Sequence, residues 1–152
     1  MQQAVPNRSE LRQRISQTGL KATHQRIVIY EALQQLHGHP AAEEVFHQLR
    51  PANPSISLGT VYKSLDSFVE AGLIKRVLSE AGSRRYDANC HPHNHIYCCN
   101  TNEIIDFADP ELEQLIQEFF SRKKLDNFEL ASVFVQITGN KKNPENGISI
   151  TN

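Results

Sequence analysis

Apolar residues at helical spacing, followed by two short strand-like runs, constrain the fold of the first half of this 152-residue chain more than any other feature. Apolar residues three and four positions apart share one face of a helix, and two short runs around a glycine turn are typical of a β-hairpin. The clearest helical stripes are Ala42, Val45, Phe46 and Leu49, and Val61, Leu65, Phe68 and Val69. The sequence therefore predicts a group of helices closed by a hairpin.

Capping residues and helix breakers set the ends of the predicted elements. Thr23 and Ser57 are predicted N-caps because their side-chain oxygens can accept hydrogen bonds from the first turn, and Gly72 ends the last helix. The predicted helices cover residues 8–17, 24–36, a third segment opened by His39 and Pro40, and 57–71, and the predicted strands cover 73–79 and 84–87. Helices followed by a hairpin form a winged helix-turn-helix, in which residues 57–71 are the recognition helix.

The predicted recognition helix and hairpin carry polar and basic residues suited to DNA. The first outward positions of the helix face the major groove, and nearby cations bind phosphates. The predicted DNA contacts are Thr60, Tyr62, Lys63, Ser64, Arg26 and Arg84. Residues 1–86 hold 11 Lys/Arg and 7 Asp/Glu, whereas residues 87–152 hold 5 and 10, which favours a DNA-binding module joined to a different module. A solvated basic face on a small helical domain is the alternative.

The second half has a mixed pattern of strands and one helix. Predicted strands cover residues 93–99, 103–107 and 128–138, and an apolar stripe predicts a helix that begins after Asp109. The predicted fold class is α+β, with a winged-helix DNA-binding domain at 1–86, an α/β dimerisation and metal-sensing domain at 87–139, and a flexible tail at 140–152. About fifty ordered residues bury little apolar surface alone, so a homodimer is expected.

Composition and cysteine usage favour a cytoplasmic protein with no membrane partner. No run reaches the ~18 apolar residues of a membrane span, and the first residues lack the apolar core of a secretory signal. The three cysteines, Cys90, Cys98 and Cys99, are an odd number and two are adjacent, which argues against a disulfide framework. We therefore expect a reducing, cytoplasmic location.

Three of the seven histidines, His91, His93 and His95, lie within five residues. Alternate residues of a strand point to one face, so His93 and His95 lie together, and Asp106 is on the strand predicted to pair with theirs. Asp87 is a second carboxylate, at the junction of the two halves. Imidazole and carboxylate donors suit a divalent first-row ion such as Fe²⁺, Mn²⁺ or Zn²⁺. A solvated histidine-rich turn is the alternative explanation.

Several short motifs, taken together, resemble the ferric uptake regulator family over residues 8–139. They are Thr23-His24-Gln25-Arg26, His39-Pro40, Thr60-Val61-Tyr62, Arg85-Tyr86-Asp87, His93-x-His95 and Ile105-Asp106-Phe107. The resemblance implies a dimer with an N-terminal winged helix, a C-terminal α/β domain and a regulatory metal between them. It further implies an operator that is an AT-rich inverted repeat in double-stranded DNA. The implied metal ligands are His39, Asp87, His93, His95 and Asp106.

The implied ligand set contains only nitrogen and oxygen donors. One site per chain is expected to hold Fe²⁺ or Mn²⁺, with Zn²⁺ as a substitute. Many members of the family hold a structural zinc with two Cys-x-x-Cys pairs, but here Thr101 stands in the first pair and Asn140-Lys141-Lys142 stands in place of the second. Three cysteines cannot form a four-cysteine site in one chain, so no structural zinc is expected. Cys90, Cys98, Cys99 and His91 receive no role, although one cysteine of the adjacent pair is expected to be buried.

Both carboxylate ligands implied by the resemblance are aspartates. This pattern resembles the peroxide-responsive repressors of the family, since iron-uptake regulators more often carry glutamate at these positions. We therefore predict a metal-dependent repressor, not an enzyme, that senses hydrogen peroxide through oxidation of a ligand histidine, His39 or His93. An iron- or manganese-responsive uptake regulator without peroxide chemistry is the alternative within the family. A non-haem iron enzyme and a metal-independent interaction domain are alternatives from other classes.

Overall fold

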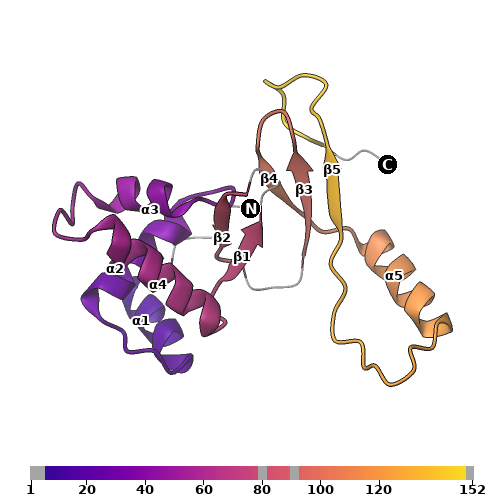
Figure 1. Cartoon of the computed structure of the whole chain (residues 1–152), viewed down its shortest axis with the longest axis horizontal. Coiled ribbons are helices and arrows are strands. Elements are labelled where there is room, and N and C mark those ends of the chain that lie inside the picture. Colours follow the sequence, from indigo (N-terminus) through magenta and orange to yellow (C-terminus); the bar gives the residue numbers. More distant parts are fainter. Residues whose placement is uncertain (1–5, 79–81, 90–92, 150–152) are drawn as a thin grey trace. The chain divides into compact units, whose positions relative to one another are not determined.

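The chain is organised as two units, residues 1–91 and residues 92–152. A computed structural model describes residues 6–78, 82–89 and 93–149. In these ranges the first unit has four helices and a two-stranded hairpin, and the second has a three-stranded sheet and one helix (Figure 1). The elements of the predicted α+β fold are thus present in the predicted order.

The four helices of the first unit begin and end close to their predicted positions. They are α1 Arg8–Gln17, α2 His24–Gln35, α3 Ala42–Leu49 and α4 Leu58–Glu70. The side chains of Thr23 and Ser57 accept hydrogen bonds from the backbone amides of Arg26 and Thr60 at 3.4 and 3.1 Å. These amides lack a partner within the helix, so the caps stabilise the helix starts. Gly72, with a φ of 73°, ends α4 in the left-handed conformation that glycine adopts readily.

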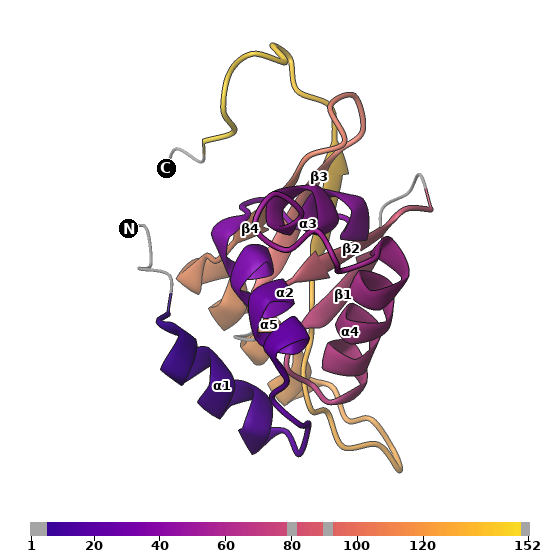
Figure 2. The same ribbon diagram turned by 90° about the vertical axis from the view of Figure 1, so that its left-hand side faces the viewer.

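The apolar faces of these helices form the core of the first unit. Helix α2 contacts α1, α3 and α4, an arrangement that Figure 2 shows from the side. The side chains that are fully buried include Leu11, Ile15, Ile29, Leu33, Val45, Val61, Leu65 and Phe68. The ring of Phe68 packs against Tyr30 with centroids 5.6 Å apart, so it joins α4 to α2. Burying a side chain of this size contributes about 1.5–3 kcal/mol.

An antiparallel hairpin follows α4 and forms the wing. Its strands are β1 Lys75–Leu78 and β2 Arg84–Asp87. The amide of Tyr86 donates to the carbonyl of Pro40 at 3.0 Å, and Ala41 forms a β-bridge with Arg85. Strand β2 therefore also holds the segment before α3. Asp87, which the sequence interpretation assigned to the second domain, is the last residue of β2 and belongs to the first unit.

The second unit is a three-stranded sheet with β3 at its centre. The strands are β3 Asn94–Cys98, β4 Ile104–Phe107 and β5 Gln136–Gly139, in the order β4-β3-β5. Strand β4 pairs antiparallel with β3, whereas β5 pairs parallel with it after a connection that contains α5 Pro110–Arg122 (Figure 1). As predicted, Asp109 caps α5, because its side chain accepts from the amides of Glu111 and Leu112 at 2.8 and 3.0 Å.

The last strand is shorter than predicted. Residues 128–138 were expected to be extended and paired, but the ladder with β3 covers only Gln136–Gly139, so the prediction is wrong before Gln136. A strand forms where a neighbour supplies ladder hydrogen bonds, and β3 supplies them only along this short stretch. Phe128, Leu130 and Phe134 are exposed in the single chain, at 64%, 41% and 56%. Their apolar character, which favoured a strand, is therefore not explained by burial within a single chain.

Two asparagines hold the ends of β5. The side-chain oxygen of Asn94 accepts from the amide of Val135 at 2.9 Å. Asn100, in the turn after β3, exchanges two hydrogen bonds with the backbone of Lys141, each 3.0 Å long. We call these two sets of contacts the asparagine clasps. Beside the second clasp the ammonium group of Lys141 pairs with Glu103 and lowers the pKa of that carboxyl below its ordinary value.

Large apolar side chains remain exposed on the second unit. Its buried apolar residues in the described ranges are Tyr97, Cys98 and Ile104. The exposed ones are Leu115, Phe119, Leu125, Phe128, Leu130, Phe134 and Ile137. Large exposed apolar side chains in this number are typical of a unit that contacts a partner. Among the described residues, no helix has the length and apolarity needed to cross a membrane.

Candidate metal centre and DNA-binding face

Two histidines and an aspartate converge on one side of the sheet in the second unit. His95 stands opposite Asp106 in the β3–β4 register, and His93 lies two residues before His95 on the same face. The Nε2 atoms of His93 and His95 lie 3.2 and 3.8 Å from Oδ1 of Asp106. The two imidazole rings meet edge to face, with centroids 4.6 Å apart. The structure thus brings together three of the predicted ligands.

The first unit holds the other two predicted ligands, His39 and Asp87, beside each other. Nε2 of His39 lies 3.5 Å from Oδ2 of Asp87. The other carboxylate oxygen of Asp87 accepts from the amide of Asn89 at 2.8 Å, which fixes the orientation of the group. These residues are distant in sequence, and the pairing of Tyr86 with Pro40 brings them together.

His39 has an unusual backbone conformation. Its φ is 60°, and it follows Gly38, whose φ is 80°. A residue with a side chain in this region costs about 1–3 kcal/mol and persists only where its surroundings hold it. Here a guanidinium nitrogen of Arg85 donates to the His39 carbonyl at 3.2 Å. Backbone strain of this kind concentrates at functional sites, which supports a specific role for the His39 imidazole.

These donors fit a divalent first-row metal ion. Two imidazole nitrogens and a carboxylate oxygen that face one another offer a cation three donors at one point. Nitrogen and oxygen donors without thiolate suit Fe²⁺ or Mn²⁺, whereas closed structural zinc sites favour cysteine. His93, His95 and Asp106 would hold such an ion in the second unit, and His39 and Asp87 are donors of the same type in the first.

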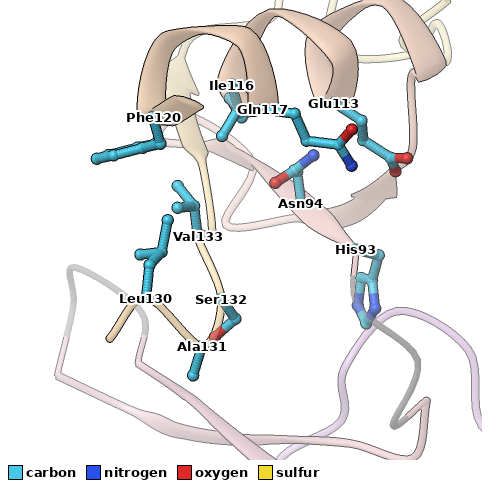
Figure 3. A pocket seen from close by; sticks show the side chains of 10 residues that line it. All are labelled: His93, Asn94, Glu113, Ile116, Gln117, Phe120, Leu130, Ala131, Ser132 and Val133. Carbon is cyan, nitrogen blue, oxygen red and sulfur yellow. The ribbon is translucent and has the colours of Figure 1, made fainter. Parts of the chain in front are cut away.

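A pocket of 520 Å³ lies beside His93 in the second unit (Figure 3). Its walls come from β3, from α5 and from residues 130–133. In Figure 3 His93 lies at one end, apart from the apolar residues, and the polar side chains of Asn94, Glu113 and Gln117 lie on its side of the pocket. The pocket has room for water-sized molecules, and His93 forms part of its wall.

The predicted DNA contacts lie on α2, on α4 and on the wing. Lys63 and Arg84 are exposed. The hydroxyl of Thr60 hydrogen-bonds with that of Ser57 at 2.9 Å, so it is part of the helix cap. Arg26 is half-buried, and one of its guanidinium nitrogens donates to the carbonyl of Lys21 at 2.9 Å. Lys63 and Arg84 are therefore the two exposed cations of the set.

Two residues of α4 differ from their predicted orientation. Ser64 is only 7% exposed, because it lies three residues after Val61 and four before Phe68, on the buried stripe of the helix. The prediction that Ser64 faces outward is wrong. Tyr62 is half-buried: its ring packs partly against the core, and its hydroxyl donates to Oε1 of Glu43 at 2.5 Å.

Sequence reasoning missed the acidic residues that organise this face. Asp66 on α4 accepts from Arg76 at 2.6 Å and from the hydroxyl of Tyr86 at 3.4 Å, which ties the helix to the wing. Burial and the nearby Asp66 carboxylate raise the pKa of Tyr86 above its ordinary value. In the same way Glu43 on α3 accepts from the hydroxyl of Tyr62, which ties α4 to α3. The only sequence signal was the presence of carboxylates in a basic domain.

The cysteines agree with the prediction as far as they are described. Cys98 is buried and Cys99 is exposed, which confirms that one of the adjacent pair is a buried residue. Thr101, which stands in a family cysteine position, donates its hydroxyl to Glu103 at 2.9 Å. Cys90 and His91 lie outside the described residues.

Comparison with known proteins identifies the family. Residues 17–138 match the family model of the ferric uptake regulators, so the chain belongs to the Ferric uptake regulator family. Its members are transcription regulators rather than enzymes, and they act as metal-responsive repressors that bind DNA as dimers. They combine an N-terminal DNA-binding domain with a C-terminal dimerisation domain, as the resemblance implied.

Individual relatives include peroxide, iron and manganese regulators. The chain is 37% identical over 101 residues to the peroxide-responsive repressor PerR of Staphylococcus aureus, which covers 66% of this chain and 68% of the relative. The Vibrio cholerae ferric uptake regulator superposes with a TM-score of 0.71 at 32% identity, covering 86% of this chain and 98% of that one. The Pseudomonas aeruginosa regulator, solved with manganese, gives 0.72 at 31% identity, covering 86% and 97%.

Proposed function

We propose that this chain is a metal-dependent repressor that senses hydrogen peroxide. The convergence of His93 and His95 on the carboxylate of Asp106 carries the proposal, because it is a donor set for Fe²⁺ or Mn²⁺. The similarity to the peroxide-responsive repressor of Staphylococcus aureus supports hydrogen peroxide as the signal.

The proposed regulatory site takes ligands from both units. His93, His95 and Asp106 bind the ion from the second unit, and His39 and Asp87 bind it from the first. An ion shared in this way fixes the orientation of the winged helix, and in a dimer only one arrangement matches two DNA half-sites. Metal binding and DNA binding then strengthen each other by the same factor.

The proposed response to peroxide is the loss of one ligand. Bound Fe²⁺ would supply the redox chemistry that activates hydrogen peroxide next to the ligands. In the net step the O–O bond breaks and one oxygen bonds to a carbon of the His39 or His93 imidazole in place of its hydrogen. That hydrogen leaves with the other oxygen as water, so the ring is oxidised by two electrons with peroxide as the oxidant. The pocket beside His93 supports this residue as a target, because a molecule the size of hydrogen peroxide in the pocket would lie next to it. Each event consumes one sensor, so there is no catalytic turnover.

The proposed DNA-bound form is a homodimer on an AT-rich inverted repeat. The exposed rings of Phe119, Phe128 and Phe134 on the second unit are suited to contact with a second copy. Lys63 and Arg84 on the first unit are exposed cations suited to phosphates. The proposed dimer and DNA contacts therefore use different residues, from different units.

We further propose that no structural zinc is needed. Thr101 and Lys141, which stand in the regions where the family carries cysteine pairs, both contact Glu103 instead. Elemental analysis of purified protein should find no zinc that resists chelation. A stoichiometric zinc released only by thiol modification would contradict this part of the proposal.

The decisive experiment measures DNA binding and histidine oxidation on the same samples. With Mn²⁺ the parent should bind a duplex that carries an AT-rich inverted repeat, and with Fe²⁺ it should lose binding after a peroxide pulse. Peptide mass analysis should then find one added oxygen atom on the peptide with His39 or the peptide with His93. His93→Ala should abolish metal-dependent binding, whereas His47→Ala, at an exposed position of α3, should not. Binding that persists after peroxide, without added oxygen, would reject peroxide sensing.

A manganese- or iron-responsive uptake regulator is the second candidate. The similarity to the Pseudomonas aeruginosa regulator solved with manganese favours it. In that case a chelator should release the protein from DNA, but peroxide at the same dose should leave binding and both histidines unchanged.

A further inference from the structure

The hydroxyl of Tyr62 is held by a carboxylate from another helix. Glu43, in the first turn of α3, accepts its hydrogen bond at 2.5 Å, and the ring packs partly against the helical core. This bond raises the pKa of Tyr62 above its ordinary value and lowers the pKa of Glu43. At neutral pH the phenol therefore keeps its proton and the carboxylate stays charged.

The charge of Glu43 opposes the binding of DNA by α4. Its side chain is exposed, and its partner Tyr62 precedes the exposed Lys63 on the proposed recognition helix. A carboxylate repels phosphates, so on charge alone its removal should tighten DNA binding. A favourable role for Glu43 must therefore come from the side chain that it holds.

Resting on the proposed DNA-binding function, we propose that Glu43 is a positioning residue that fixes Tyr62 so that its ring, and not its hydroxyl, contacts the bases. The hydroxyl already donates its proton to Glu43, so it is not the donor to a base or phosphate. Tyr62 then has two groups left for DNA, the apolar ring edge and the accepting lone pairs of its oxygen, and the proposed contact is the ring edge. In the major groove the apolar group that a base offers is the thymine methyl, so this methyl is the feature that Tyr62 reads.

Two substitutions of Glu43 separate its holding role from its charge. Glu43→Gln removes the charge but keeps an oxygen that can accept from Tyr62, whereas Glu43→Ala removes both. If Glu43 acted through charge alone, both variants would bind DNA more tightly than the parent by the same factor. If it positions Tyr62, Glu43→Ala should bind about two- to tenfold more weakly than Glu43→Gln, because a freed side chain must be ordered on binding.

Tyr62→Phe completes a double-mutant cycle. It keeps the ring and removes the hydroxyl, so in this background Glu43→Ala and Glu43→Gln should bind DNA equally. Glu70→Gln, the same charge change at an exposed position at the end of α4, is the control for charge. Its effect should be the same with Tyr62 and with Phe.

An operator in which uracil replaces thymine tests the base contact itself. If Glu43 had only a structural role, its substitution would not change the response to uracil. Affinities are measured by fluorescence anisotropy with Mn²⁺ on duplexes that contain thymine or uracil. The parent and Glu43→Gln should lose about fourfold in affinity for each contacted methyl that is removed, and Glu43→Ala should lose less. Equal binding by the two Glu43 variants, or the same uracil response in both, would overturn the proposal. The proposal would also be overturned if Tyr62→Phe lost much of its affinity for DNA while its response to uracil stayed the same as that of the parent. A parent that shows no Mn²⁺-dependent DNA binding would instead reject the proposed function.

Discussion

Replacing Asn94 with alanine should loosen one end of β5 and leave the other end in place. In the parent Asn94 is 5% exposed, and its side-chain oxygen accepts from the amide of Val135 at 2.9 Å. Alanine removes the acceptor, while Val135 keeps its donor in a partly buried position. A buried donor that loses its partner costs about 1–3 kcal/mol.

This free energy can be read at a single amide by hydrogen exchange. For an amide that exchanges through local opening, 1–3 kcal/mol corresponds to about 5- to 150-fold faster exchange. Asn100→Ala is the matched control at the other end of β5, where the amide of Lys141 donates to Asn100 at 3.0 Å. The bond at Asn100 is exposed, so water can replace it, and the effect on Lys141 should be smaller.

The assay is amide exchange followed by NMR on the parent and both variants, with Val28 in the core of α2 as the internal reference. We expect Asn94→Ala to accelerate Val135 and Asn100→Ala to accelerate Lys141. Unchanged protection of Val135 in Asn94→Ala would refute the reasoning. Equal acceleration of both amides in both variants would show that β5 opens as one unit, which also contradicts independent clasps.

Other substitutions test the metal site, the ion pair beside the second clasp and the DNA-binding face. Asp106→Glu should keep metal-dependent DNA binding but need a higher dose of peroxide to leave DNA, since it lengthens a ligand without changing its charge. If this variant leaves DNA at the same dose as the parent, the result counts against the proposal of peroxide sensing. The contact with Lys141 lowers the pKa of Glu103, so its stabilisation is present above the ordinary value of 4.5 and is lost as the pH falls through the lowered value. Thermal unfolding should therefore show Glu103→Gln less stable than the parent at neutral pH, with a difference that disappears in acid. Lys63→Ala should weaken DNA binding and reduce the slope of log affinity against log salt by about 1 per half-site, and an unchanged slope would remove Lys63 from the phosphate contacts.

The helices were predictable because their signals are local. Thr23, Ser57 and Asp109 cap helices at the predicted positions, and each cap needs only the next three residues. The hairpin strand at residues 84–87 was predicted with the same bounds for a similar reason, since its partner lies just across a short turn. Local signals of this kind do not depend on how the units assemble.

Non-local contacts were not predictable. The extent of β5 depends on a parallel partner about forty residues away, so the apolar run at residues 128–138 was read as a strand although most of it is exposed. The inward position of Ser64 was missed because a small polar residue gives no hydrophobic signal on a buried stripe. The bond between Tyr62 and Glu43 joins different helices, so no spacing rule reveals it.

The candidate site was predictable in part from spacing. His93, His95 and Asp106 followed from strand alternation and pairing, and their side chains lie together in the structure. His39 came from the family resemblance alone, and from the residues Asp87 was placed only as a carboxylate at the junction of the two halves. Their proximity depends on the pairing of β2 with the segment before α3, and the left-handed backbone of His39 has no signature in the sequence beyond the neighbouring glycine and proline.

The asparagine clasps are made of amide groups, which hydrogen peroxide does not oxidise and chelators do not remove. A domain closed by thiolates around zinc would be open to both agents, because oxidised sulfur no longer binds the metal. In this chain the hydrogen bonds that hold β5 to β3 are chemically inert. The imidazole of His93, next to Asn94, is by contrast a proposed target of oxidation. Under the proposed function, oxidation of a ligand histidine would therefore leave the hydrogen bonds that hold β5 intact, and the protein would stay folded after it had responded.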